Sequence, residues 1–314
     1  MKGYIIVILN IIYSVFKWKK LNRIFKFFGA VAFIGIERRR IGSDGDGVTT
    51  LVGFHGCNLR CKYCLNPQSI TTGKEWRWYT PKMLYKEIRK DEIYFNQTGG
   101  GICFGGGEPL KHADFIKRFK MLCNDNWKIT IETSLNVSEK QLYSIIGIVD
   151  KFIIDIKDMN SYIYKSYTGV NNTLVLNNLQ YLISKGYANK IIIRVPSIAG
   201  FNSETDIQKS MNIIQEMGID DIEQLTYLTT KTKTSIPDEN SINVGKMICN
   251  YLKSIRADFA QTHNINYQTT DCTYQGFCIG TCPACESELK YLTKEYHKII
   301  KRNYWKSRLI INPL

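Results

Sequence analysis

The sequence predicts an α/β fold, a partial and open (β/α)6 barrel of the TIM type with a C-terminal cysteine-rich extension. Two observations support this prediction. Short apolar, β-branched segments alternate with longer helical ones along the middle of the chain, which is the pattern of a parallel sheet covered by helices. Six such units are fewer than the eight that close a TIM barrel, so we expect the barrel to stay open.

The expected strands are residues 48–54, a short strand within 99–109, and residues 127–132, 151–156, 190–195 and 222–228. The expected helices are residues 80–95, 113–123, 138–146, 172–185, 204–217, 241–256 and 286–305. Thr80 and Pro81 predict the start of the first helix, because threonine caps a helix and proline fits its first turn.

Length and composition set the outer bounds. A chain of 314 residues with 44% apolar residues can build a full core, so nothing in the composition indicates general disorder. We divide the chain into a basic and apolar extension (residues 1–35), a barrel (residues 36–262) and a cysteine-rich module (residues 263–314).

The net charge of +14 is concentrated near the N-terminus, where residues 1–40 hold nine basic residues against Glu37 alone, or 9 − 1 = +8. We interpret the charge as a solvated basic surface, and no nucleic-acid-binding module is recognisable. The apolar run Tyr4–Phe16 is too short for a spanning helix and unlike a signal peptide. Three alternatives stay open for the extension: weak contact with an anionic membrane surface, packing on the barrel, or an over-extended start codon.

Most of the ten cysteines are clustered at spacings typical of metal sites. Clustered thiols in an enzyme-sized chain predict a reducing, cytoplasmic location and metal chemistry rather than disulfides. The three isolated cysteines, which we expect to be small buried apolar residues, are Cys103, Cys123 and Cys249.

The first cluster is the C-x3-C-x2-C triplet of Cys57, Cys61 and Cys64. It follows the C-terminal end of the first expected strand, where barrels of this type place their chemistry. Three thiolates leave one iron of an iron–sulfur cube without a protein ligand. The alternatives are redox thiols or a zinc site, for which His55 is the nearest fourth ligand.

Several further motifs follow the triplet in a fixed order between Ile36 and Thr229. They are Gly-Cys-Asn-Leu-Arg-Cys-Lys-Tyr-Cys-Leu-Asn-Pro (56–67), the glycine-rich stretch 99–109, Asp-Ile-Lys-Asp-Met-Asn (155–160), Tyr-Thr-Gly-Val-Asn (167–171) and Ile-Arg-Val-Pro (193–196). Together they resemble the radical S-adenosylmethionine (SAM) superfamily, and within it the glycyl-radical-enzyme activating family. The resemblance implies a partial barrel of the radical SAM type.

The resemblance also implies a [4Fe–4S] cluster on the triplet, with SAM bound to its open iron. Reduction would cleave SAM to methionine and a 5′-deoxyadenosyl radical that abstracts a hydrogen atom from a protein or peptide. In the leading hypothesis the target is a glycine of a glycyl radical enzyme, and the alternative is maturation of a ribosomally made precursor peptide. The implied electron donor is a flavodoxin or ferredoxin, and the implied setting is anaerobic.

The expected SAM-binding residues come from these motifs. The glycines would let backbone groups approach SAM, or simply form a tight turn. Lys157 and Arg194 could pair with the methionine carboxylate, or form a surface ion pair. Glu132 and Asp155 are expected to hold a monovalent cation or to orient SAM, although the family has aspartate at position 132 and a histidine near residues 227–228. The full set is Tyr63, Asn66, Gly105, Gly106, Gly107, Glu108, Glu132, Asp155, Lys157 and Arg194.

The second cysteine cluster lies after the barrel. Its C-x5-C-x3-C-x2-C spacing supplies four thiolates, enough to ligate fully a [4Fe–4S] cluster or a zinc ion. We favour an auxiliary cluster, with zinc as the alternative. Activating enzymes with extra clusters usually carry them in an insert after the first triplet, whereas a position after the barrel is more like peptide-modifying radical SAM enzymes. The four residues are Cys272, Cys278, Cys282 and Cys285.

Overall fold

The computed structural model describes residues 29–71, 76–226, 239–272, 274 and 282–311. Its strands are β1 (Val31–Ile41), β2 (Val48–Phe54), β3 (Arg77–Tyr79), β4 (Gly101–Gly106), β5 (Lys128–Thr133), β6 (Lys151–Asp155), β7 (Ile191–Ser197) and β8 (Ile222–Thr226). Its α-helices are α3 (Pro81–Ile88), α4 (Glu92–Thr98), α5 (Ala113–Lys120), α6 (Glu139–Tyr143), α7 (Ser161–Thr168), α8 (Thr173–Ser184), α9 (Glu204–Glu216), α10 (Glu239–Thr262) and α11 (Pro283–Ile311). The expected features before residue 29, and Cys278, lie outside the described residues.

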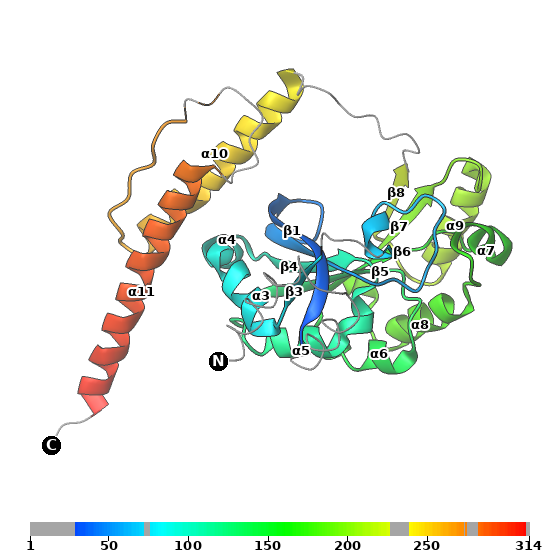
Figure 1. Ribbon diagram of the computed structural model, residues 1–314, viewed down its shortest axis with the longest axis horizontal. Helices are drawn as coiled ribbons and strands as arrows, with labels where there is room; N and C mark the ends of the chain where they lie inside the picture. Colours follow the sequence, from blue (N-terminus) through cyan, green and yellow to red (C-terminus); the bar gives the residue numbers. More distant parts are fainter. Residues whose placement is uncertain (1–28, 72–75, 227–238, 273, 275–281, 312–314) are drawn as a thin grey trace, which may run out of the picture.

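The strands form one open sheet in the order β3-β1-β2-β4-β5-β6-β7-β8 (Figure 1). Strands β2 and β4 to β8 pair in parallel. They are the six strands expected from the sequence, so the prediction of an open six-unit barrel is confirmed. Because β3 and β8 end the order, the sheet is not closed into a barrel.

Two antiparallel strands at one edge, β1 and β3, were not predicted. Strand β1 begins at Val31, so the domain boundary that we placed after residue 35 cuts through a strand. Three consecutive arginines precede the last residue of the strand, and they obscure its apolar pattern. In the structure Arg38 and Arg39 form ion pairs with the fully buried Asp91, at 2.6 and 3.2 Å. These ion pairs compensate the charges of two arginines in a strand that packs against the rest of the protein.

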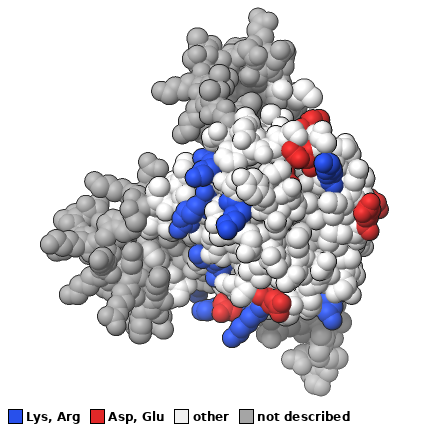
Figure 2. Space-filling model, turned by 90° about the vertical axis from the view of Figure 1, so that its right-hand side faces the viewer, with Lys and Arg blue, Asp and Glu red and all other residues white. Residues whose placement is uncertain are grey.

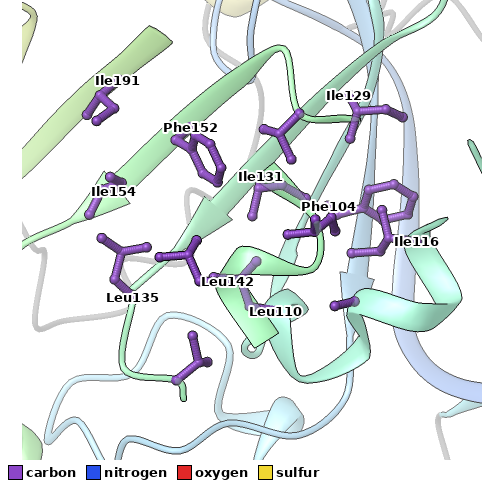
Figure 3. Close-up of a cluster of buried hydrophobic side chains, with 14 of the residues drawn as sticks. Phe104, Leu110, Ile116, Ile129, Ile131, Leu135, Leu142, Phe152, Ile154 and Ile191 are labelled. Carbon is purple, nitrogen blue, oxygen red and sulfur yellow. The ribbon is translucent and has the colours of Figure 1, made fainter. Parts of the chain in front are cut away.

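The main core lies between the sheet and its helices. Alternate residues of the parallel strands enter this core, including Phe104 of β4, Ile131 of β5 and Ile154 of β6. Figure 3 shows them opposite Leu110, Ile116 and Leu142, which come from the helical layer. The residues between them in the strands face the other side, as the period of two requires. Glu132 and Asp155 therefore point away from this core, toward the inner face of the open barrel.

Helices α10 and α11 lie side by side and extend away from the sheet (Figure 1). A second core joins them to α4, where Tyr94 packs with Leu252, Phe259 and Leu292. We expected α10 to belong to the barrel, but it packs with α11 and α4. Both helices are longer than predicted.

Figure 2 shows the face on the side of α7 and α9. Most of its described surface is uncharged, and Lys and Arg side chains gather on one half of it. Within the described residues, no helix combines the length and the apolar character that crossing a bilayer requires.

Candidate functional site

The cysteine loop (residues 55–66) leaves the end of β2 and is held by backbone hydrogen bonds from two sides. On one side, Glu108 N, just after β4, donates to Gly56 O (2.8 Å). On the other side, Arg60 N donates to Thr168 O at the end of α7 (3.0 Å). The loop is therefore fixed between the β4 end of the barrel and α7.

The three thiols of this loop line one cavity of about 100 Å³. This volume is below the roughly 300 Å³ of an ordinary ligand pocket, so the assignment rests on the lining residues. Of the ten residues expected to bind SAM, seven line the cavity, and Gly105, Glu108 and Arg194 do not. Those seven are Tyr63, Asn66, Gly106, Gly107, Glu132, Asp155 and Lys157.

The glycine-rich loop is needed first for packing. Gly106 has φ +88°, and a Cβ there would lie 2.7 Å from the Cα of Gly53 in β2. A Cβ at Gly105 would lie 2.6 Å from the Oε2 atom of Glu132. The tight-turn interpretation is therefore right, and it is compatible with backbone approach to a ligand, because Gly106 and Gly107 also line the cavity.

Glu108 is buried and does not line the cavity. Its carboxylate accepts hydrogen bonds from the Thr133 hydroxyl (2.6 Å), the Ser134 hydroxyl (2.8 Å) and Leu110 N (3.2 Å). Burial raises its pKa, although these hydrogen bonds oppose the shift. Glu108 therefore links the ends of β4 and β5 through these hydrogen bonds.

The charged residues form two groups, one pair and one set of three. Lys157, only 7% exposed, lies 2.9 Å from Asp155, and both line the cavity. Arg194 lies behind the cavity, where it donates to Glu132 (3.2 Å) and Glu223 (2.8 Å). Arg194 is thus in contact with a residue of the cavity wall without lining the cavity itself.

Aromatic residues close the side of the cavity next to α7. The ring of Tyr63 meets Phe201 edge to face at 5.8 Å, and the Tyr167 hydroxyl donates to Tyr63 O at 3.1 Å. Tyr167 lines the cavity but was not among the expected site residues. It belongs to the Tyr-Thr-Gly-Val-Asn motif that supported the resemblance. That motif was the sequence signal that could have identified Tyr167 as a site residue.

His55, the ligand that a zinc site on the triplet would use, is directed elsewhere. Its ring lies 3.5 Å from that of Trp76, and its Nε2 is 3.2 Å from Thr71 O. It does not line the cavity. The three thiols line the cavity and His55 does not, which fits a cluster with one open iron better than a zinc site completed by His55.

Three members of the predicted C-terminal quartet, Cys272, Cys282 and Cys285, lie within the described residues. Cys282 and Cys285 lie together at the start of α11, and the cysteine packed with them is Cys249 of α10. Cys272 is exposed. Another cavity, of about 790 Å³, lies between Lys90 and the lysine-rich face of α11, and none of the expected site residues lines it.

The ionisation of Glu132 makes the free energy of unfolding depend on pH. Burial and the nearby Asp155 raise its pKa to about 7. The folded protein then binds more protons than the unfolded chain, so this contribution is present below about pH 4.5 and is lost as the pH rises through 7. We expect Glu132→Gln to become more stable than the wild type between pH 5 and pH 8, by roughly 2 kcal/mol.

Urea unfolding of the apo-protein at several pH values measures this difference. Glu223→Gln is the control, because Glu223 contacts the same arginine but is 42% exposed. A difference between Glu132→Gln and wild type that stays constant from pH 5 to pH 8 would contradict the assignment.

An open β/α barrel with three cysteines beyond its first parallel strand defines a class of iron–sulfur enzymes. The model of the radical SAM superfamily matches residues 51–212 of this chain, 162 of 314 residues. The chain belongs to the radical SAM superfamily. Membership implies a [4Fe–4S] cluster and SAM as cofactors, and an enzyme that carries out radical chemistry.

Curated relatives of this chain include activating enzymes. The chain is 29% identical over 217 residues to pyruvate formate-lyase 2-activating enzyme of Escherichia coli K12, covering 59% of this chain and 73% of the relative. It is 32% identical over 238 residues to (2S)-3-sulfopropanediol dehydratase activating enzyme of Klebsiella oxytoca, covering 56% and 74%. Among solved structures, a domain of pyruvate-formate lyase-activating enzyme from Bacteroides vulgatus is 26% identical, with a TM-score of 0.35, and the match covers 50% of this chain and 94% of that domain.

Proposed function

We propose that this chain activates a glycyl radical enzyme. The observation that carries the proposal is the joint position of the three thiols, the glycine loop and the Lys157–Asp155 pair around one cavity. When bound, the cluster and SAM supply a 5′-deoxyadenosyl radical, which takes a hydrogen atom from the glycine α-carbon and leaves 5′-deoxyadenosine, methionine and a glycyl radical. The names of the curated relatives support the same activity.

In this proposal the thiols of Cys57, Cys61 and Cys64 hold the cluster. Lys157 meets the carboxylate of SAM, because its ammonium group is held at the cavity wall by Asp155. Tyr63 and Asn66 bound the same space from the cysteine loop, and Asn66 Nδ2 is anchored 3.3 Å from Gly106 O.

Glu132 and Asp155 form the acidic part of the wall, and a monovalent cation there would offset their charge. Glu132 and Arg194 act together in this scheme, because Arg194 holds the Glu132 carboxylate and does not reach the cavity. The role of Arg194 is therefore to position Glu132, and that of Glu108 to hold the glycine loop.

The remaining parts of the proposal concern partners and the C-terminal module. The electron donor is a reduced flavodoxin or ferredoxin, and the protein acts in an anaerobic cytoplasm. The cysteines after the barrel hold an auxiliary [4Fe–4S] cluster, or zinc as the alternative. Peptide maturation is the less supported function, because the curated relatives described above are activating enzymes.

The test mixes the reconstituted protein with SAM, a reductant and a candidate glycyl radical enzyme encoded nearby. We expect an electron paramagnetic resonance signal of a glycyl radical and one 5′-deoxyadenosine per radical formed. The partner with its radical glycine replaced by alanine should give no such signal. Deoxyadenosine formed with a precursor peptide, but not with the enzyme partner, would favour the peptide alternative.

A further inference from the structure

Three thiols from two helices meet beside the barrel. Cys249 of α10 is 4% exposed and Cys285 of α11 is 2% exposed, and the partly buried Cys282 packs against them. Cys285 N donates to the Cys282 sulfur at 3.5 Å, because Cys282 directly precedes the first turn of α11. The sequence spacing does not reveal this group, since Cys249 precedes Cys282 by 33 residues (282 − 249).

A buried cation lies next to these thiols. The side chain of Arg256 is fully buried, and its Nη2 is 3.8 Å from the Cys285 sulfur. The same guanidinium donates to the Tyr94 hydroxyl (2.6 Å) and to Glu288 (2.8 Å). Arg256 therefore places a buried positive charge beside the Cys285 sulfur, at the junction of α10 and α11.

The other isolated cysteines, Cys103 and Cys123, do not pack with these three thiols. Cys103 is buried in β4. Among the described residues, no three Cys, His, Asp or Glu side chains stand close enough to hold a metal as they are. That is equally true of Cys57, Cys61 and Cys64, whose cluster follows from the superfamily. For both groups of cysteines, the relevant observation is therefore that three cysteine side chains come together.

We propose that Cys249 is a thiolate ligand of the C-terminal metal centre, together with Cys282 and Cys285. The inference rests on the auxiliary centre of the proposed function, and it changes the ligand set that the sequence suggested. The metal would be a thiolate-binding one, zinc or an iron–sulfur cluster. Such a centre cross-links α10 to α11 close to the place where both pack on α4.

Metal content of the full chain tests this inference. We would purify wild type, Cys249→Ala, Cys282→Ala and Cys123→Ala anaerobically, and measure zinc as isolated and iron with sulfide after reconstitution. Cys123 is the matched control, because it is a partly buried cysteine at the end of α5, far from both thiol groups in the sequence. 5′-Deoxyadenosine formation reports separately whether the barrel and its own cluster are intact.

Cys249→Ala and Cys282→Ala should each lose the same centre, about one zinc or about four irons per chain. Cys123→Ala should lose neither, and the triplet cluster should remain in all variants. Cys249→Ser, nearly isosteric, separates ligation from packing: a ligand role predicts loss of metal in both variants, and a packing role predicts recovery with serine.

Two results would overturn the inference. One is a wild type with no metal beyond the triplet cluster, and the other is a Cys249→Ala variant that keeps the metal which Cys282→Ala loses. A wild type that binds the second metal but forms no deoxyadenosine would instead refute the proposed function and leave the ligand assignment standing.

Discussion

Replacing Cys61 by alanine is expected to reduce 5′-deoxyadenosine formation to the background level. Cys61 lines the cavity between the other two thiols of the loop, and a cube held by only two protein thiolates loses its support. The loss should exceed the roughly 10- to 100-fold effect of changing a residue that only supports a metal ligand. Anaerobic reconstitution, followed by iron analysis and chromatography of the products, measures both cluster content and SAM cleavage.

The fold of the Cys61→Ala variant should survive, because the loop is anchored by its backbone. Arg60 N and Lys62 N donate to Thr168 O and Tyr167 O of α7, and neither bond needs the Cys61 side chain. An unchanged thermal unfolding midpoint of the apo-protein would show this. Cys123→Ala should cleave SAM like the wild type. Deoxyadenosine formation by Cys61→Ala at the wild-type rate would exclude the triplet as the cluster site.

The parallel strands could be predicted because both of their faces are covered. β2 is buried along most of its length and reads as an apolar run, Val-Thr-Thr-Leu-Val-Gly-Phe. Strand β1, which lies between β3 and β2, could not be predicted, because its second half contains Glu-Arg-Arg-Arg. The charges of its arginines are compensated by ion pairs with Asp91 and Glu286, which come from distant parts of the chain. Ion pairs between residues so far apart in the chain leave no local signal in the sequence.

The site was predicted best where one loop supplies the residues. The triplet, Tyr63 and Asn66 all belong to the cysteine loop and line the same cavity. Side chains on separate strands were harder to place, because the direction of a long side chain depends on its partners. Arg194 lies in the middle of β7, and its guanidinium turns to Glu132 and Glu223, away from the cavity.

The position of Cys249 shows the same limit more strongly. The spacing of cysteines in the sequence identifies only thiols that are close together in the chain. It therefore favoured a quartet between residues 272 and 285. The pairing of α10 with α11 decides which thiols meet, and this pairing brings Cys249 to Cys282 and Cys285. Helix pairing depends on the apolar faces of both helices and on α4, which the spacing of cysteines does not encode.

Replacing Arg256 by leucine is expected to lower the free energy of unfolding by roughly 3 to 5 kcal/mol, the usual cost of breaking a buried ion pair. The Arg256 side chain is fully buried, and its partner Glu288 is only 10% exposed. Without the guanidinium, Glu288 keeps the hydroxyl of Tyr267 (2.6 Å) and the N–H of Thr270 (3.1 Å) but loses its counter-charge. Urea unfolding of the apo-protein, followed by circular dichroism, measures the change.

The double variant Arg256→Leu/Glu288→Leu distinguishes charge from packing. With both charges gone, no uncompensated ion is left, and much of the lost stability should return. Lys298→Ala on α11 is the matched control, because its pair with Glu295 is solvent-exposed and should contribute about 1 kcal/mol or less. A double variant no more stable than Arg256→Leu would mean that Arg256 acts by packing alone.

The pH dependence gives an independent check on the same pair. Burial pushes the pKa of Glu288 upward, but the Tyr267 hydroxyl, the Thr270 N–H and Arg256 outweigh it and hold the pKa below its ordinary value of 4.5. The unfolded chain therefore binds more protons in acid, so the stability from Glu288 is present above pH 4.5 and is lost as the pH falls through the lower folded value. The stability difference between wild type and Arg256→Leu should shrink below pH 4.5, because a protonated Glu288 no longer needs the guanidinium. A difference that does not change with pH would show that the ion pair is not what binds α10 to α11.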